Sequence, residues 1–467
     1  MYFRLKPKYC LRGWQNAAWG ILKRPENNVY FITRPFFELL ILCDGVTNIE
    51  GETLFKILNE ELTLEGERII EECDEPTPLD DDQYYRYYDN RYIKGAFWSI
   101  TGKCNYRCRH CFMDAPGAQF GELSHEEVLD IVDQMHDCGI ANVDLTGGEP
   151  LIRPDFWDII DRILSYKMTI GQIYTNGWLV NENFLQGLKN RGLNPEIRIS
   201  FDGIGWHDWM RGVKGAEEAA LRAFDLCREY GFRTAAQLCL FKGNTDVLPQ
   251  TVELLSKHGV SRLKIGNLKE SDLWKKNCED NHLDWRGFLD ASIAYVPKYF
   301  EQGRPLTLSL GGVGLFPSGK VKLTKEMYDS QYPANKTGKC LTCESARATC
   351  YIGADGRIFP CMSMDSAPQE IQDEFPFIQE TGLKKALSSS FYLDFITRTL
   401  DDLYKINKKC DKCNYKAICG GGCRAEAAIS GDFMASDPKM CILYREGYFD
   451  KAIEAVHNAI DKYEPET

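Results

Sequence analysis

Three cysteines stand close together in the stretch "KCNYRCRHCF", residues 103–112. Cys104, Cys108 and Cys111 follow the spacing C-x3-C-x2-C, and the stretch has no fourth cysteine. Three thiolates leave one coordination position of a metal free, and open positions are where metals do chemistry. The short spacing is typical of iron–sulfur clusters. The stretch therefore predicts a cluster with one iron available to a substrate or cofactor.

A zinc site is the alternative for the same stretch, with the three cysteines completed by His110. Zinc ligands usually come as two pairs separated by a longer loop. The spacing here has no such pairs, which favours the iron–sulfur interpretation.

The run "CNYRCRHCF" resembles the signature of radical S-adenosylmethionine (radical SAM) enzymes, in which an aromatic residue, here Phe112, follows the third cysteine. The resemblance implies that the amino and carboxylate groups of S-adenosylmethionine chelate the free iron of a [4Fe–4S] cluster. It also implies that an electron from the cluster cleaves the sulfonium to give a 5′-deoxyadenosyl radical.

Supporting motifs follow in order along the chain. "GGEP", residues 147–150, resembles the family's loop for the methionine amino group: Gly147 and Gly148 allow close backbone approach, and Glu149 offers an anionic acceptor. "SFDG" resembles the strand end that contacts the ribose, and "TNG" ends the intervening strand. The resemblance assigns cofactor contacts here to Asn176, Ser200 and Asp202, with Arg211 in "MRGVKG" a candidate partner for the cofactor carboxylate.

Nine of the nineteen cysteines lie between residues 340 and 441. In a reducing cytosol such a group indicates metal rather than disulfides. The pattern resembles the SPASM domain that follows many radical SAM barrels, which implies two auxiliary [4Fe–4S] clusters and three clusters in all. The resemblance assigns to the outer cluster Cys410, Cys413, Cys419 and Cys441, and to the inner one Cys343, Cys361 and Cys423.

The fourth ligand of the inner cluster has several candidates. Cys340 is one, and Cys350 is its rival, although Cys350 falls on a presumed strand and is also explained as a packed thiol. The inner cluster can instead keep an open iron for substrate sulfur. A zinc ribbon is the competing interpretation of this region, but Cys413 and Cys419 stand too close for its usual loop of about 15–20 residues.

The elements that must position these residues alternate between strand and helix from residue 95 to about 300. There are six strand candidates separated by helical segments, and the first four of them end in or near the motifs. The helical segment at 124–139 opens with the capping box Ser124-x-x-Glu127 and closes at Gly139. Six β–α units in series predict a parallel sheet curled into a full or partial (β/α)6 TIM-type barrel. Chemistry gathers at the carboxyl ends of such strands, where the three cysteines stand.

Residues 1–92 read as a small α+β unit followed by an acidic, aromatic linker or ordered strap. Apolar β-type stretches surround the turn "RPENN", and helical periodicity follows in "PFFELLILCDG", "GETLFKILNE" and "TLEGERIIEECDE". This order resembles the PqqD-like peptide-recognition domain, a winged-helix module that binds a leader peptide at its sheet edge. A helical extension packed on the barrel is the alternative.

The composition and net charge of the chain argue against some classes of binding partner. The net charge is −12 with no long Lys/Arg cluster, which argues against nucleic acid and anionic membrane. No stretch approaches the ~20 apolar residues of a membrane span, and the N-terminus lacks the apolar core of a signal peptide. We expect a cytoplasmic protein with four parts: 1–92 for peptide recognition, 93–305 for the barrel, 306–442 for the auxiliary clusters and 443–467 as a closing helix.

Together the resemblances imply a maturase of a ribosomally made precursor peptide, with a reducing donor such as flavodoxin or ferredoxin. A Cys thioether is the favoured product; carbon–carbon or ether cross-linking and epimerisation use the same apparatus. A sulfatase-activating enzyme that makes formylglycine is the runner-up. A non-catalytic iron–sulfur carrier would leave "GGEP" and "SFDG" without a purpose. No catalytic acid or base is assigned.

Overall fold

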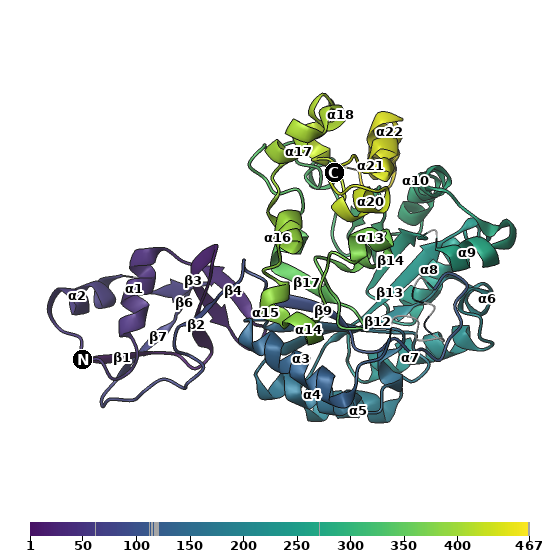
Figure 1. Ribbon diagram of the computed structural model, residues 1–467. Coiled ribbons are helices and arrows are strands. Elements are labelled where there is room, and N and C mark those ends of the chain that lie inside the picture. The colour runs from purple at the N-terminus through teal and green to yellow at the C-terminus, as the bar shows by residue number, and fades with distance from the viewer. Residues whose placement is uncertain (61, 112, 114, 116–120, 270, 466–467) are drawn as a thin grey trace.

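The computed structural model describes residues 1–467 except 61, 112, 114, 116–120, 270 and 466–467. Figure 1 shows a small N-terminal unit standing beside a larger body. The larger body has one continuous apolar core that joins barrel residues to C-terminal residues, and the N-terminal unit has a core of its own. Within the described residues, no helix is both long and apolar enough to cross a membrane.

A ten-stranded sheet forms the barrel wall, and seven of its strands follow one another in parallel. They are β9 (Gly95–Ser99), β10 (Asn142–Thr146), β11 (Thr169–Thr175), β12 (Glu196–Ser200), β13 (Thr234–Leu240), β14 (Arg262–Asn267) and β15 (Thr307–Leu310). The first six are the predicted strands. The seventh, β15, pairs in parallel with β14 and was not predicted.

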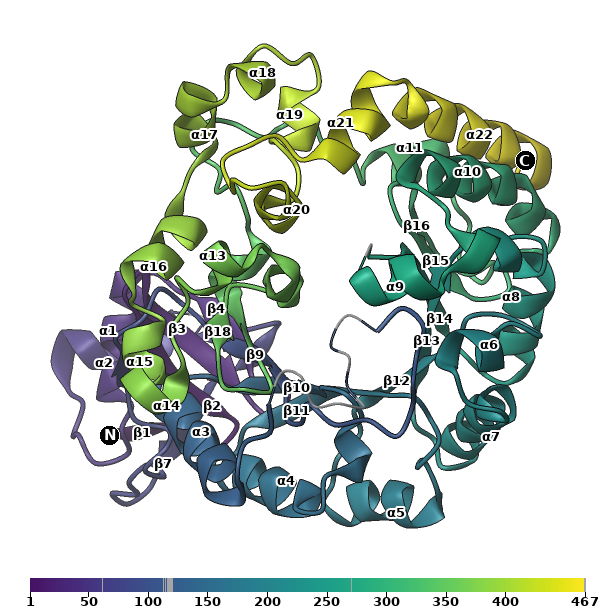
Figure 2. The same ribbon diagram turned by 45° about the vertical axis from the view of Figure 1, so that its right-hand side comes forward.

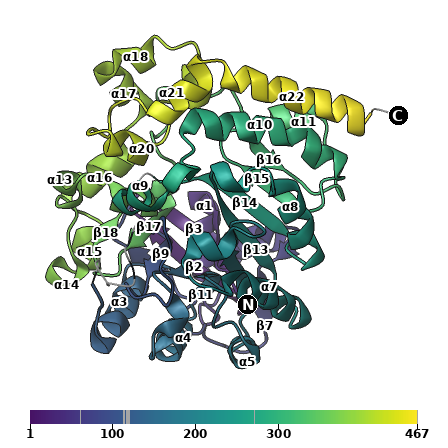
Figure 3. The ribbon, with the colours of Figure 1, turned by 90° about the vertical axis from the view of Figure 1, so that its right-hand side faces the viewer.

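Helices cover the outer face of this sheet (Figures 2 and 3). They are α3 (His125–Asp137), α4 (Phe156–Ser165), α5 (Glu182–Asn190), α7 (Ala216–Glu229), α8 (Leu248–Lys257) and α10 (Trp285–Glu301). The predicted capping box of α3 is confirmed, because Ser124 accepts from the Glu127 N–H and Glu127 accepts from the Ser124 N–H. The fold class predicted from the sequence, a partial α/β barrel, is confirmed.

The sheet continues at both ends beyond the barrel strands. β16 (Gly314–Phe316) pairs antiparallel with β15. At the other end β17 (Thr349–Ile352) pairs in parallel with β9, with Thr349 opposite Gly95, and β18 (Ile358–Phe359) turns back on β17. The C-terminal part thus joins the barrel sheet directly.

The N-terminal unit is built on a four-stranded sheet in the order β4-β3-β2-β8. Its strands are β2 (Tyr9–Trp14), β3 (Ala17–Lys23), β4 (Asn28–Phe31) and β8 (Arg86–Tyr88); β1 (Tyr2–Leu5) pairs separately with β7 (Ile70–Cys73). The helices α1 (Arg34–Leu42) and α2 (Gly51–Asn59) pack beside the sheets. The predicted linker is an ordered strap, since its β8 pairs with β2.

The third helix predicted in "TLEGERIIEECDE" is wrong. The stretch forms a hairpin of β5 (Thr63–Leu64) and β6 (Glu67–Arg68), followed by β7. Glu65 and Gly66 both have positive φ, 52° and 78°, which is the requirement of a tight two-residue hairpin turn. A two-helix unit with a β-hairpin wing results.

A buried polar contact holds the N-terminal unit to the barrel. Asn27 is 1% exposed, and its side-chain amide donates to the carbonyl oxygens of Ala141 and Lys167, both at 3.0 Å. Arg24 donates to the Lys167 carbonyl at 2.8 Å and pairs with Asp82, which also pairs with the Lys167 ammonium. The turn between β3 and β4 is therefore a joint between the two bodies, and Asn90, whose amide donates to the Cys138 carbonyl at 2.5 Å, adds a second contact.

The C-terminal part beyond β18 consists of short helices and loops. Those that carry cysteines or their neighbours are α16 (Ser390–Thr397), α18 (Lys408–Asp411), α19 (Lys416–Cys419), α20 (Arg424–Ile429) and α21 (Pro438–Arg445). The predicted closing helix is confirmed as α22 (Tyr448–Tyr463), which packs along α10 (Figure 2).

Candidate active site

The three N-terminal cysteines share one cavity at the carboxyl ends of the barrel strands. Cys104, Cys108 and Cys111 lie in the loop after β9 and border a cavity of about 240 Å³. Two backbone hydrogen bonds fix this loop, from the N–H of Arg107 to the Arg211 carbonyl at 3.2 Å and from the N–H of Arg109 to the Met210 carbonyl at 2.8 Å.

The surroundings of the thiols suit a bound cation. Burial raises the pKa of Cys104 to about 12, with the Cys108 and Cys111 thiols adding to the effect, and burial also raises the pKa of Cys108. Three thiolates so placed need a positive centre to hold them, and iron is such a centre. The donor set therefore fits the expected cluster, with Cys104, Cys108 and Cys111 as its ligands.

The zinc alternative requires His110 to complete the three cysteines as a fourth ligand. Among the described residues, which include these four, no three His, Cys, Asp or Glu side chains converge on a position for a single ion. His110 borders the cavity with an unpartnered Nδ1, and burial lowers its pKa to about 4, so its ring is neutral.

The glycine motif lies directly against the cysteine loop. The Gly148 N–H donates to the Thr101 carbonyl at 2.9 Å, and the Glu149 N–H donates to the Lys103 carbonyl at 2.8 Å. A Cβ on Gly148 would stand 2.0 Å from the Lys103 carbonyl oxygen, and one on Gly147 would stand 2.5 Å from that of Thr101. Only glycine permits this approach.

Glu149 serves the loops rather than the cavity surface. It is fully buried, and its carboxylate accepts from the Asn176 N–H at 2.7 Å, the Thr175 hydroxyl at 2.9 Å and the Leu151 N–H at 3.2 Å. Burial raises the pKa of Glu149 to about 7 against these hydrogen bonds. Glu149 thereby joins the "GGEP" turn to the "TNG" turn, and Gly147, Gly148 and Asn176 border the cavity.

Asn176 and Arg211 reach the cysteine loop from two sides. The Asn176 amide donates to Asn105 Oδ1 at 2.7 Å, and Arg211 Nη1 lies 3.8 Å from Cys108 Sγ. Arg211 Nε donates to the fully buried carboxylate of Asp202 at 2.7 Å. Burial would raise the pKa of Asp202, but the Arg211 guanidinium and His207 outweigh it and hold the pKa well below its usual range.

The predicted cofactor residues thus fall into two groups. Gly147, Gly148, Asn176, Ser200 and Arg211 border the cavity. Glu149 and Asp202 support them from behind through hydrogen bonds. Phe112 lies outside the described residues.

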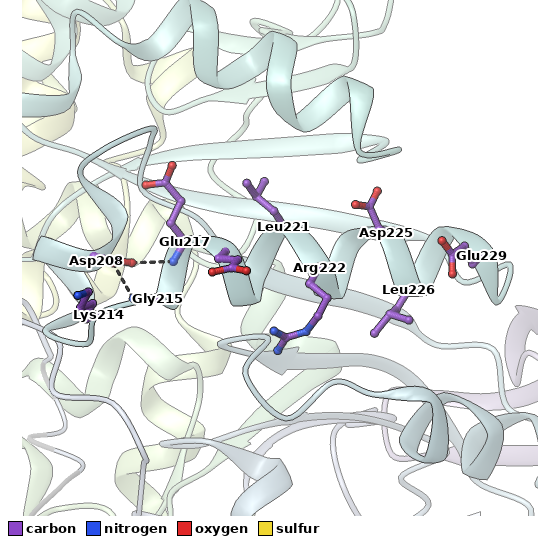
Figure 4. A pocket seen from close by; sticks show the side chains of 10 residues that line it. Asp208, Lys214, Gly215, Glu217, Leu221, Arg222, Asp225, Leu226 and Glu229 are labelled. Carbon is purple, nitrogen blue, oxygen red and sulfur yellow. Dashed lines mark hydrogen bonds between the residues drawn. The ribbon is translucent and has the colours of Figure 1, made fainter.

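The cavity also has walls that sequence reasoning did not assign. Tyr174, Gln237 and Arg198 border it from the barrel strands. Tyr351 and Met362 enter from the C-terminal part, and the Tyr351 hydroxyl lies 2.8 Å from Ser99 Oγ. Arg222 instead borders a separate groove along the outside of α7 (Figure 4).

The predicted outer-cluster cysteines come together. Cys410, Cys413, Cys419 and Cys441 border one small hollow between α18, α19 and α21. The inner cysteines also lie near one another. Burial raises the pKa of the Cys361 thiol, and the Cys423 and Cys343 thiols add to this increase.

Tyr392 lies near the inner cysteines and lacks a hydrogen-bond partner for its hydroxyl. It is fully buried, its hydroxyl has no hydrogen-bond partner, and the thiols that act on it are Cys350, Cys361 and Cys343. A buried hydroxyl without an acceptor is costly, and a cluster sulfur is an acceptor. Of the two candidate fourth ligands, Cys350 donates to the Gly95 carbonyl at 3.7 Å within the sheet, and Cys340 packs beside Leu400 and Leu403.

Comparison with known proteins identifies the class. Residues 98–255 match the Radical SAM superfamily, so the chain carries a radical SAM domain. Such a domain uses S-adenosylmethionine and a [4Fe–4S] cluster.

Three individual proteins resemble the chain at low sequence identity. The chain is 26% identical over 367 residues to the AdoMet-dependent heme synthase of Methanosarcina barkeri (strain Fusaro / DSM 804), covering 75% of this chain and 96% of the relative. It is 25% identical over 365 residues to the PqqA peptide cyclase of Granulibacter bethesdensis (strain ATCC BAA-1260 / CGDNIH1), covering 77% and 90%. The crystal structure of Streptococcus suis SuiB bound to precursor peptide SuiA has the same fold, with a TM-score of 0.64 at 15% identity over 94% of this chain and 99% of SuiB.

Proposed function

We propose that this enzyme matures a ribosomally made precursor peptide by abstracting hydrogen from its core and closing a cross-link, with a Cys thioether the favoured product. S-Adenosylmethionine and the cluster, when bound, would supply the hydrogen-abstracting radical. The chain's own residues supply the cavity, the peptide-docking edge and the auxiliary cysteines. The observation that carries the proposal is the joining of one cysteine-lined cavity to an N-terminal unit with an unpaired sheet edge.

The docking edge is β4. Within the part of the chain that the structure describes, β4 pairs only with β3, and its Phe31 side chain is 55% exposed. An extended peptide can add to such an edge through main-chain hydrogen bonds, while side-chain pockets give specificity. The turn that leads into β4 contains Asn27, which contacts the barrel, so a leader bound here would be tethered next to the catalytic body.

The cavity walls suit a peptide segment. Tyr174, Gln237 and Arg198 offer hydrogen-bonding groups from the barrel strands, and Met362 offers an apolar, adaptable surface from the C-terminal part. The similarity to the PqqA peptide cyclase and the shared fold with SuiB, whose crystal contained its precursor peptide, support a peptide substrate.

The auxiliary cysteines would hold two further [4Fe–4S] clusters, which the hollow between α18, α19 and α21 and the orphaned Tyr392 hydroxyl support. Cross-linking removes two hydrogens from the peptide: one leaves in the abstraction, and the other leaves as a proton and an electron. The inner cluster would accept that electron, and a flavodoxin or ferredoxin would supply the electron that starts each turnover.

The test uses the anaerobically reconstituted enzyme, S-adenosylmethionine, dithionite and the short peptide encoded beside its gene. We expect 5′-deoxyadenosine and a peptide lighter by two hydrogens per linkage, located by tandem mass spectrometry. A Cys104→Ala variant is the control and should give neither product. Absence of 5′-deoxyadenosine from the parent enzyme would refute the enzyme chemistry.

The mass of the product separates the alternatives. A peptide whose mass is unchanged in ordinary water but which takes up deuterium when the reaction is run in D2O would indicate epimerisation. Conversion of a Cys or Ser to formylglycine would indicate the sulfatase-activating reaction. Turnover of a tetrapyrrole in place of any peptide would favour the activity named in the heme synthase relative.

A further inference from the structure

Arg424 is a buried cation placed directly after Cys423. It opens α20 and is 1% exposed. Its guanidinium donates to the carbonyl oxygens of Phe433 and Ala435, both at 2.8 Å, and to that of Gly421. The guanidinium is therefore held in one orientation by backbone dipoles.

The loop that encloses the guanidinium needs glycine at three consecutive positions. Gly420, Gly421 and Gly422 have φ of +60°, +82° and +82°. A Cβ on Gly421 would stand 2.4 Å from Leu403 Cδ2 and 3.1 Å from an Arg424 nitrogen, and one on Gly422 would stand 2.4 Å from Asp437 Cβ. The sequence "CGGGCR" thus builds a close-fitting enclosure for one positive charge.

Among the described residues, no Asp or Glu oxygen lies within ion-pair distance of the Arg424 guanidinium. Asp437 acts on it from further away, and its carboxylate is taken by the N–H groups of Cys423 at 2.8 Å, Lys439 at 2.8 Å and Met440 at 3.1 Å. Carbonyl dipoles satisfy the donors but do not neutralise a buried cation, which is normally paired.

A second buried arginine shows the usual arrangement. Arg304 is 2% exposed and also donates to backbone carbonyls, those of Pro317 and Val321, but it pairs with the carboxylate of Glu464. Arg424 instead lies beside cysteines. It follows Cys423 directly in the chain and donates to the carbonyl oxygen of Gly421, and Gly421 borders the same hollow as Cys410 and Cys419.

These cysteines belong to two different sets. Cys410 and Cys419 border the outer hollow, and Cys423 belongs to the inner set. We propose that Arg424 is a counter-cation shared by the two auxiliary clusters, where it stabilises their reduced forms and so raises the reduction potential of both. The assignment rests on the auxiliary clusters proposed above. Arg424 acts through the clusters without touching substrate, and is a positioning residue.

The physical reason is the charge of the clusters. An iron–sulfur cluster held by thiolates becomes more negative when it is reduced, and net charge and hydrogen bonding set its potential. A fixed cation in a dry setting favours the more negative state. A neutral side chain in its place should lower both potentials, whereas lysine should keep much of the effect.

The experiment is an EPR-monitored redox titration of the full chain, loaded anaerobically with iron and sulfide. The background is the triple variant Cys104→Ala, Cys108→Ala and Cys111→Ala, which lacks the ligands of the first cluster and removes that cluster from the spectra. In this background Arg424→Gln should move both auxiliary midpoint potentials downward, Arg424→Lys should stay nearer the parent, and Arg304→Gln, the matched buried-arginine control, should leave both unchanged. Unchanged potentials in Arg424→Gln, or a shift in one cluster alone, would overturn the shared role.

Cluster loading keeps the result decisive. If Arg424→Gln binds no iron while Arg424→Lys does, the positive charge itself is required, which supports the proposal. If neither variant loads while Arg304→Gln does, the side chain is needed for its shape and the proposal fails. A parent that binds no iron in this background refutes the auxiliary clusters themselves, whereas a loaded parent with an indifferent Arg424 refutes only the counter-cation.

Discussion

Replacing Gly148 with alanine tests the closest contact in the active site. Gly148 has no unusual φ, so the substitution adds only a Cβ. That atom would stand 2.0 Å from the Lys103 carbonyl oxygen and 3.1 Å from Cys104 Cβ, where ordinary contact begins at 3.4 Å. The two loops must therefore separate by up to about 1.4 Å, and the oxygen that moves is backbone.

The expected cost follows from this displacement. The Lys103 carbonyl also accepts the Glu149 N–H at 2.8 Å, so the shift strains the hydrogen bond that joins the "GGEP" turn to the cysteine loop. Misplacing a reacting centre by about 1 Å costs on the order of 100-fold in rate. Gly148→Ala should lower the rate of 5′-deoxyadenosine formation by about that factor, with iron content retained.

The assay measures 5′-deoxyadenosine by chromatography under anaerobic conditions, beside iron content and the melting temperature. Gly266→Ala is the matched control, because Gly266 also has an ordinary φ and a Cβ there would meet nothing within 4 Å. A Gly148→Ala enzyme within about threefold of the control would show that the glycine does not set the geometry of the site.

Three further substitutions test other contacts. Burial raises the pKa of Asp144 from 3.8 to about 6, so the stability that this carboxyl contributes is present below pH 4 and lost as the pH rises through 6. Asp144→Asn should therefore recover up to about 3 kcal/mol of unfolding free energy at pH 7.5 and little at pH 4. Equal differences between variant and parent at both pH values would contradict this. Asn27→Ala removes two buried hydrogen bonds of the joint, about 1–3 kcal/mol, and should lower the yield of modified peptide per 5′-deoxyadenosine; an unchanged ratio would show that the joint does not guide the peptide. Tyr392→Phe deletes an unpartnered buried hydroxyl, so it should raise the melting temperature of the iron-free protein and remove that gain in the loaded protein; a gain in both forms would show that no cluster sulfur accepts from Tyr392.

The sequence located the catalytic cavity because its determinants are local. The C-x3-C-x2-C spacing and the two glycines of "GGEP" are short motifs at strand ends, and parallel strands bring their carboxyl ends to one edge. The sequence did not show which residues of these motifs line the cavity and which support them from behind. Nothing in "SFDG" shows that Asp202 is the buried partner of Arg211, nine residues later, rather than a group on the cavity surface.

The errors in the fold have two physical origins. In "TLEGERIIEECDE" the apolar residues fit a helix as well as a hairpin, and the Glu65-Gly66 pair, a two-residue turn signal, was the clue that favoured the hairpin. The addition of β17 to β9 could not be predicted from local pattern, since it joins Thr349 to Gly95 across most of the barrel sequence. The turn between β5 and β6 thus had a local sequence signal, whereas the pairing of β17 with β9 had none.

That long-range pairing ties the auxiliary part to the catalytic cavity. β17 continues the barrel sheet at β9, the strand that leads into the cysteine loop, and the Tyr351 hydroxyl on β17 lies 2.8 Å from Ser99 on β9. Cys361 follows the partner strand β18 by two residues, so the inner cysteines are fixed to the same wall. Because a sheet ladder is stiff compared with a flexible linker, a cluster held by the inner cysteines would stay at a fixed distance from the cavity, as the proposed oxidative ring closure would require.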